Sequence, residues 1–288
     1  MYAPPFDYYR AKSIDEAGTL LKQHPGAKVL AGGHTLIPLL KLRLATPAAV
    51  IDIGRIAELK GVTVKDGLVR IGALTTHAEL AASAIVREQC PALAEAAAHV
   101  GDPAVRNRGT IGGNVAHADP ASDLPTVLAA VAARFVVTGS GGSKTVAADR
   151  FFTGLMSTAL GEGDLLTAIE IPAQAAGQAG AYVKFEHPAS RYAVLGVAAV
   201  LTGSGGTCTS AAVAIGGLVP TAVRAAAVER ALAGQPLSDA TFVNAAAQVS
   251  GDLGGDLIGD LYASAEYRKA VAPVWVKKAL TAAASRLR

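Results

Sequence analysis

A short run of small and flexible residues at positions 173–180 (AQAAGQAG) divides the chain into two parts of different character. Short strand-like stretches alternate with helical patterns before it, whereas three strand-like stretches and then mostly helical sequence follow it. Runs of this composition join domains, and 288 residues are enough for two domains that each bury a core. We therefore predict an α+β protein with domains at residues 1–174 and 175–288.

The chain begins with a pattern of helix, strand, glycine loop and helix. Ser13 and Glu16 have the spacing of a capping box, and the glycine loop is the tetrapeptide GGHT at residues 32–35. The expected elements are a helix at residues 13–24, a strand at 27–31 and a helix at 36–44. This succession predicts a small α/β unit.

The rest of the first domain surrounds a second glycine segment, TIGGN at residues 110–114, which we expect to be a loop. A polar run at residues 117–125 follows, and it is long for a connector. Lys65-Asp66-Gly67 has the composition of a hairpin turn. The expected strands lie at residues 49–53, 61–64, 68–71, 134–138, 144–147 and 165–171, and the expected helices at 77–82, 91–99 and 126–133.

The second domain has the pattern of an antiparallel sheet followed by helices. Strands are expected at residues 182–186, 192–201 and 208–216. We predict hairpin turns for the glycine-rich stretches at residues 139–143 and 203–206. The Gly-Lys-Ser/Thr order of a phosphate loop is absent there, and no G-x-G-x-x-G follows a strand, which argues against a Rossmann domain.

Composition and charge exclude several classes of protein. The longest apolar run, at residues 193–201, is far shorter than the ~20 residues that cross a bilayer. The N-terminus lacks the pattern of a secretory signal, so we expect a cytoplasmic protein. The net charge is only +3 with scattered Lys and Arg residues, which argues against a nucleic-acid partner. Cys90 and Cys208 stand alone and the histidines show no metal spacing, so we expect no cluster or metal in this chain.

Two glycine segments, residues 31–35 and 110–114, are the candidate ligand-binding features. Paired glycines permit positive φ and close backbone approach, so successive N–H groups can point at an anion such as a diphosphate. Thr35, Thr110 and Asn114 would add side-chain hydrogen bonds. Each segment alone is more typical of an ordinary turn. The residues by themselves therefore lead only to a two-domain protein with a candidate phosphate-bearing ligand.

With the residues around them, these segments resemble the two FAD signatures of the molybdenum hydroxylase flavoproteins, a family that includes the medium subunit of aerobic carbon monoxide dehydrogenase and the flavin domain of xanthine dehydrogenase. The matching residues are Leu30-Ala-Gly-Gly-His-Thr-Leu-Ile37 with Lys41-Leu-Arg43, and Thr110-Ile-Gly-Gly-Asn114 with Asp119-Pro-Ala-Ser-Asp123-Leu-Pro125. Residues 184–193 and 266–268 also resemble that family, so the likeness covers nearly the whole chain. It implies a two-part FAD-binding domain of the vanillyl-alcohol oxidase-like (PCMH) type, with subdomains at about 1–58 and 59–174. A C-terminal domain with an antiparallel sheet and helices follows.

The resemblance implies an FAD site made by both glycine segments and by residues farther along the chain. Its expected residues are Leu30, Ala31, Gly32, Gly33, His34, Thr35, Thr110, Gly112, Gly113, Asn114, Asp123, Leu166, Lys184 and Tyr192. The two segments are expected to hold the diphosphate, mostly through backbone N–H groups. His34 stands where some flavoproteins of a related fold attach FAD covalently, but the family binds it without a bond, so we expect noncovalent FAD.

Four of these residues have individual expected roles. Asp123 corresponds to a carboxylate that accepts hydrogen bonds from the cofactor, and the alternative is a cap of the helix near Pro125. Leu166 matches a position whose main chain lies at the flavin ring. Lys184 would stabilise negative charge on the reduced flavin, and the alternative is an exposed strand lysine. Tyr192 would cover one face of the ring, and the alternative is a packed strand aromatic.

The family places a molybdopterin in a large subunit and two [2Fe–2S] clusters in a small one. The resemblance therefore implies an oxidoreductase subunit without catalytic residues for the substrate, which passes electrons from the clusters through FAD to NAD, a quinone or oxygen. We expect a dimer of heterotrimers. The alternatives are a self-contained FAD-dependent oxidase or reductase and a non-catalytic nucleotide-binding scaffold. His117 and Glu186-His187-Pro188 depart from the carbon monoxide dehydrogenase pattern, so carbon monoxide, aldehydes and nitrogen heterocycles all stay open as substrates.

Overall fold

The computed structural model of the chain describes residues 2–139 and 141–287 and confirms a mixed α+β protein. The strands are β1 (Asp7–Arg10), β2 (Lys28–Leu30), β3 (Ala49–Asp52), β4 (Val62–Lys65), β5 (Leu68–Gly72), β6 (Arg134–Gly139), β7 (Gly142–Ala147), β8 (Phe152–Gly154), β9 (Ser157–Thr158), β10 (Leu165–Pro172), β11 (Gln178–Glu186), β12 (Ala193–Ser204), β13 (Thr207–Gly216) and β14 (Val223–Arg224). The helices are α1 (Ile14–Gln23), α2 (Leu36–Lys41), α3 (His77–Ala82), α4 (Ala84–Gln89), α5 (Pro91–His99), α6 (Pro103–Arg106), α7 (Ile111–His117), α8 (Asp123–Ala130), α9 (Ala148–Phe151), α10 (Ala226–Leu232), α11 (Asp239–Ala246), α12 (Val249–Asp252) and α13 (Ala265–Ala284), with one 3₁₀ turn, η1 (Ala57–Leu59).

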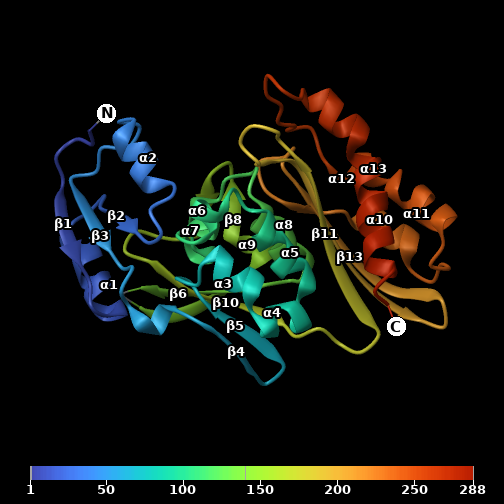
Figure 1. Cartoon of the computed structure of the whole chain (residues 1–288), viewed down its shortest axis with the longest axis horizontal. Coiled ribbons are helices and arrows are strands. Elements are labelled where there is room, and N and C mark those ends of the chain that lie inside the picture. The colour runs from blue at the N-terminus through green and yellow to red at the C-terminus, as the bar shows by residue number, and fades with distance from the viewer. Residues whose placement is uncertain (1, 140, 288) are drawn as a thin grey trace.

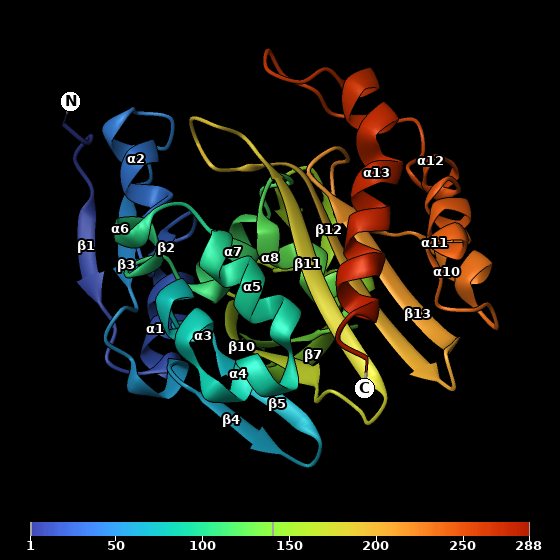
Figure 2. The same ribbon diagram turned by 45° about the vertical axis from the view of Figure 1, so that its right-hand side comes forward.

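These elements form layers along the long axis of the molecule. In Figure 1 the small N-terminal sheet lies at one end, and the C-terminal sheet and its outer helices lie at the other. Helices α5 and α8 pack on strands β11, β12 and β13 from the inside, and α10 and α13 cover the same sheet from the outside. Figure 2 shows this order of helix, sheet and helix from a second direction. The chain therefore crosses from one sheet to the next through a central helical layer.

The N-terminal sheet is parallel, with strand order β1-β3-β2. The expected helix at its start is confirmed as α1, because the Ser13 side chain accepts a hydrogen bond from the Glu16 N–H at 3.1 Å. The Glu16 carboxylate accepts a bond from the Lys12 N–H at 2.7 Å, so only half of the expected capping box forms. The predicted strand at 27–31 is β2, and it ends at the first glycine loop.

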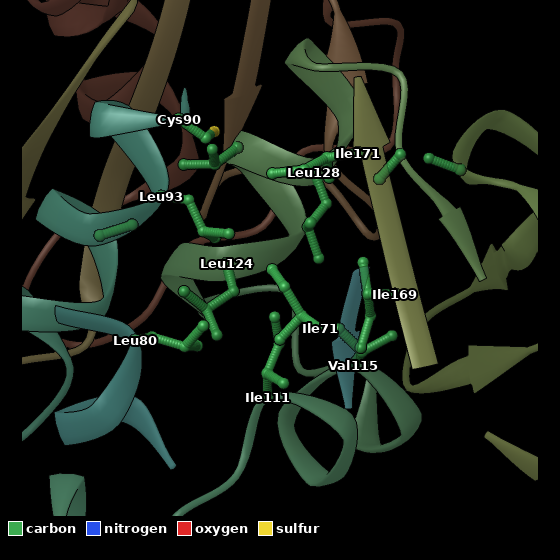
Figure 3. Packing of buried hydrophobic residues seen from close by; sticks show 14 of the residues in the cluster. Ile71, Leu80, Cys90, Leu93, Ile111, Val115, Leu124, Leu128, Ile169 and Ile171 are labelled. Carbon is green, nitrogen blue, oxygen red and sulfur yellow. The ribbon is translucent and has the colours of Figure 1, made fainter. Parts of the chain in front are cut away.

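The middle sheet has strand order β4-β5-β10-β6-β7. Its first hairpin turns at Asp66 and Gly67, both with positive φ, as a two-residue turn of this composition requires. Apolar side chains from β5, β6 and β10 pack with those of α3, α5, α7 and α8 in the largest core. Figure 3 shows Ile71 and Ile169 from the sheet meeting Ile111, Val115 and helix α8. This core fixes the start of α7 against the sheet.

The C-terminal sheet is antiparallel with order β11-β12-β13-β14, which confirms the strands expected there. Helices follow it, as the sequence indicates. Residues 173–177 connect β10 to β11 along the surface. Within residues 2–139 and 141–287, no helix combines the length and apolar character that crossing a membrane demands.

The structure differs from the sequence prediction at several elements. The second glycine segment is not a loop, because Ile111, Gly112, Gly113 and Asn114 form the first turn of α7 behind the N-cap Thr110. Helix α8 begins at residue 123, three positions before the expected helix at 126–133, and α4 was not predicted. The predicted turn at residues 139–143 includes residue 140, which lies outside the described residues, although β6 and β7 pair on either side of it.

Candidate cofactor-binding site

A cavity of about 760 Å³ opens between the first glycine loop, helix α7 and the loop that joins β11 to β12. This volume is in the range of small-molecule and cofactor sites, about 300–1,000 Å³. All but two of the residues expected to bind FAD line it: Ala31, Gly32, Gly33, His34, Thr35, Thr110, Gly112, Gly113, Asn114, Asp123, Leu166 and Tyr192. The exceptions, Leu30 and Lys184, are not among the lining residues. The fold thus gathers segments that are far apart in the sequence.

The first glycine loop presents its backbone to this cavity. A Cβ atom on Gly32 would overlap the carbonyl oxygen of Arg108, so only glycine fits there. Gly33 has φ of +79°. Among the described residues, none accepts a hydrogen bond from the N–H groups of Gly33, His34 or Thr35. Successive backbone N–H groups without an acceptor can bind an anion without Lys or Arg.

The second glycine segment differs from the first in that its backbone N–H groups are bonded within the protein. The N–H groups of Ile111, Gly112, Gly113 and Asn114 are all used within the protein, by Thr75 O, Ala73 O, Thr110 Oγ1 and Thr110 O respectively. Gly112 is required for packing, since a Cβ there would collide with Ala73. These N–H groups therefore already have partners within the protein, and the expectation that this segment holds a diphosphate stays a prediction. What it offers the cavity is the Thr110 and Asn114 side chains and the bare surface of Gly113.

Asp123 joins helix α8 to strand β11. Its Oδ1 accepts a hydrogen bond from the Tyr182 hydroxyl at 2.6 Å, and its Oδ2 lies 2.9 Å from Lys184 Nζ. Asp123 is the first residue of α8, behind the N-cap Ser122, so the alternative that it caps the helix is wrong. Burial raises the pKa of Asp123, while Lys184 and Tyr182 favour its ionised form.

Lys184 is buried and paired. Its side chain is 1% exposed, so the alternative of an exposed strand lysine is wrong. Besides Asp123, its ammonium group donates to the His99 carbonyl at 3.1 Å. The Tyr182 hydroxyl belongs to the same group, and burial first, then Asp123, raises its pKa well above the usual value. The Lys184 charge is thus balanced inside the protein.

Leu166 and Tyr192 also line this cavity. The register between β10 and β6 shifts between Leu166 and Ala168, and this irregularity turns the backbone of Leu166 relative to its neighbour strand. Tyr192 is 48% exposed. Burial of its hydroxyl first, and then Asp119 and Asp123, raise its pKa. Tyr192 is therefore not a fully packed strand aromatic, because much of its side chain faces open space.

Three buried polar atoms in or beside this cavity have no partner among the described residues: His77 Nδ1, Asn114 Oδ1 and Arg191 Nε. Unpartnered buried polar atoms are rare and call for a ligand or water. Burial, followed by the charges of His34 and Arg106, lowers the pKa of His77 to about 4. The sequence analysis did not identify His77 or Arg191, because a lone histidine at the start of a helix and an arginine in a turn belong to no motif that indicates a binding site.

The residues present fit an FAD molecule. The cavity combines free backbone donors at one loop, mixed apolar and polar walls, and unpartnered polar atoms that a polar ligand can satisfy. Its lining also includes Leu21, His24 and residues 161–165, which the sequence did not indicate. Within the part of the chain that the structure describes, no three His, Cys, Asp or Glu side chains gather as a metal site. Both cysteines are buried and free.

Comparisons with known proteins cover almost the full length. Residues 4–174 match the FAD binding domain in molybdopterin dehydrogenase, and residues 180–283 match the CO dehydrogenase flavoprotein C-terminal domain. The chain is 41% identical over 290 residues to the carbon monoxide dehydrogenase medium chain of Hydrogenophaga pseudoflava, with 99% of each chain covered. It is 37% identical to the glyceraldehyde dehydrogenase medium chain of Sulfolobus acidocaldarius, covering 97% of this chain and 98% of that one. A solved structure of the Hydrogenophaga pseudoflava carbon monoxide dehydrogenase, which lacks the Mo-pyranopterin moiety of its molybdenum cofactor, contains a similar chain with TM-score 0.95, 43% identity and full coverage of both chains.

Proposed function

Because this chain belongs to the family of FAD-binding medium subunits of molybdenum hydroxylases, we propose that it holds FAD noncovalently in the cavity described above and passes electrons through it. The observation that carries the proposal is that Gly33, His34 and Thr35, whose N–H groups have no acceptor among the described residues, line a cavity of cofactor size. Bound FAD supplies the ability to take up electrons singly and release them in pairs. The chain itself is an oxidoreductase subunit.

We propose specific tasks for the lining residues. The N–H groups of Gly33 to Thr35 hold the diphosphate, and the Thr110 hydroxyl and the Asn114 amide add side-chain hydrogen bonds. Leu166 and Tyr192 border the flavin ring. Asp123 accepts a hydrogen bond from the cofactor on a lone pair that Tyr182 and Lys184 leave unused. Leu30 and Lys184 support the site without lining it.

The assembly and its substrate belong to the same proposal. We assign the molybdopterin and the [2Fe–2S] clusters to a large and a small partner subunit in a dimer of heterotrimers, with NAD, a quinone or oxygen as acceptor. A cytoplasmic location and the domain division at residues 174 and 175 stay predictions; the two matched ranges, which end at 174 and begin at 180, support the division. Relatives of similar identity are named for carbon monoxide and for glyceraldehyde, so the substrate is determined outside this chain.

Flavin content and substrate turnover test the proposal together. The purified chain mixed with FAD should bind one FAD per chain and show flavin absorbance. It should not oxidise carbon monoxide, aldehydes or nitrogen heterocycles until the partner subunits are added. Robust turnover by the isolated chain would indicate a self-contained oxidase, and the absence of flavin bands both alone and in the complex would indicate a scaffold.

Acid precipitation tests the noncovalent link. The yellow colour should stay in the supernatant when the loaded protein is precipitated with acid, as expected for FAD held without a bond to His34. The His34 ring instead lies with Nδ1 3.3 Å from the Gly32 carbonyl oxygen. Colour retained in the pellet would contradict this part of the proposal.

A further inference from the structure

Two ion pairs lie near Tyr192, and they differ in how far the anion cancels the charge of the cation. Lys184 would be the obvious cation for the flavin ring, yet its ammonium group lies 2.9 Å from Asp123 and both side chains are at least 95% buried. An ion pair of this kind has little net charge when viewed from the cavity. The Lys184 charge is therefore mostly cancelled before it reaches a ligand.

Among the described residues that line the cavity, Arg191 is the cation that remains near Tyr192. It lines the cavity beside Ser190 and Tyr192. Its Nη2 lies 3.2 Å from Glu186 Oε2, with the two side chains 43% and 35% exposed. A pair that is this open to water is loosely held, so Glu186 moderates the Arg191 charge without removing it. Lys28, the other Lys or Arg in the lining, belongs to the distant strand β2.

The Arg191 guanidinium has an unused donor at Nε. This donor is buried and has no acceptor among the described residues, although Nη2 of the same guanidinium has one. Leaving a buried N–H donor without a partner is unfavourable, and a ligand that supplies the acceptor removes that cost. The ring nitrogens and carbonyl oxygens of a flavin are acceptors of this kind.

The loop holds Arg191 in a fixed and unfavourable backbone conformation. Its φ is +60°, in the left-handed region that arginine seldom occupies. The turn is closed by bonds from the Arg191 N–H to the His187 carbonyl and from the His187 N–H to the Tyr192 carbonyl. The N–H groups of Ala189 and Ser190 both donate to His187 Nδ1. Strain of this sort is maintained where surrounding contacts enforce it, often at a functional site.

We propose that Arg191, moderated by Glu186, is the positioning and charge-supplying residue that raises the reduction potential of FAD in this subunit. The inference rests on the proposed function. Two electrons from the partner's iron–sulfur clusters and one proton from water convert the neutral oxidised ring to an anionic reduced ring. A nearby cation therefore favours the reduced form, and a nearby anion disfavours it.

The two-electron midpoint potential of the full chain loaded with FAD tests this assignment. Arg191→Gln should weaken the binding of reduced relative to oxidised FAD by about tenfold, which lowers the potential by about 30 mV. Glu186→Gln should raise the potential, because it removes the moderating anion. Arg191→Lys keeps the charge and should retain most of the wild-type value. The opposite signs of the first two variants separate electrostatic tuning from damage to the fold.

Arg224→Gln is the matched control. Arg224 forms a surface pair with Glu229 at 2.6 Å, outside the cavity lining, so its loss should leave the potential unchanged. An unchanged potential in Arg191→Gln, or an equal fall in Arg191→Lys, would overturn the inference while leaving the proposed function intact. Failure of the wild-type chain to hold FAD, alone and with its partner subunits, would overturn both.

Discussion

Lys184 on strand β11 and Asp123 at the start of helix α8 form an ion pair of 2.9 Å in which both side chains are buried. The pair connects the C-terminal sheet to the helical layer at the cavity wall. Removing one partner from a buried pair leaves the other charge without compensation, which costs more than the pair itself contributes. The stability of the fold and the structure of the cavity wall are therefore linked at this contact.

Asp123→Asn should lower the free energy of unfolding by about 3–5 kcal/mol, because the Lys184 ammonium group stays buried without its anion. Urea unfolding of the FAD-free chain measures this change. Adding Lys184→Met to Asp123→Asn should recover part of the loss. Arg70→Met is the comparison, since it removes an exposed 2.6 Å pair with Glu170 and should cost less than about 1 kcal/mol. Equal costs for both single variants would contradict the buried-pair assignment.

Gly32→Ala should abolish or strongly weaken FAD binding. The added Cβ would overlap the Arg108 carbonyl oxygen, so the first glycine loop would have to move away from the segment that precedes α7. Flavin fluorescence titration measures the affinity. Gly18→Ala serves as the control, because its Cβ would meet nothing within 4 Å in helix α1 and should stabilise the chain by roughly 0.5–1 kcal/mol. Wild-type affinity in Gly32→Ala would show that the loop position is not essential.

The buried His77 ring should make the chain less stable in mild acid. Its pKa is about 4 in the folded protein against 6.5 for a free imidazole, so the unfolded chain binds more protons between these values. Above pH 6.5 the ring is neutral in both states and does not affect the free energy of unfolding. As the pH falls from 6.5 toward 4, the free energy of unfolding should decrease by up to about 3 kcal/mol. Urea unfolding across this range should give a flatter profile for His77→Gln. Parallel profiles would mean that His77 does not titrate as inferred.

Both thiols should be unreactive in the folded chain. Burial raises the pKa of Cys90 to about 12, and burial also raises the pKa of Cys208. Since the thiolate is the reactive form, a disulfide reagent at pH 8 should label neither residue quickly in native buffer and both after denaturation. Rapid labelling of one thiol in the native state would indicate local opening of its core.

Features encoded by neighbouring residues could be predicted from the sequence. Ser13 caps α1, Asp66 and Gly67 make the first hairpin turn, and the three long C-terminal strands follow from their apolar runs. Each of these depends on a few consecutive side chains. At these positions the conformation that the local residues favour is also the one found in the fold, because no contact with a distant residue favours another conformation.

Features that depend on distant partners could not be predicted. Gly112 and Gly113 have low helix propensity, but Thr75 and Ala73 bind the backbone of their segment and the core encloses Ile111, so the segment becomes a helix. The Tyr182–Asp123–Lys184 cluster joins β11 to α8, and no local sequence pattern around these three residues predicts it. The candidate site was located in outline by resemblance, while the role of each glycine segment depended on tertiary packing.

The surface connection at residues 173–177 joins two parts of the chain that also hold each other through noncovalent contacts. Helix α8 precedes the connection but packs on β12 and β13, which follow it, and Lys184 pairs with Asp123 across the same boundary. A peptide-bond break within residues 173–177 would leave all of these contacts in place. The two fragments should then co-purify as one particle, and separately expressed halves should assemble by complementation.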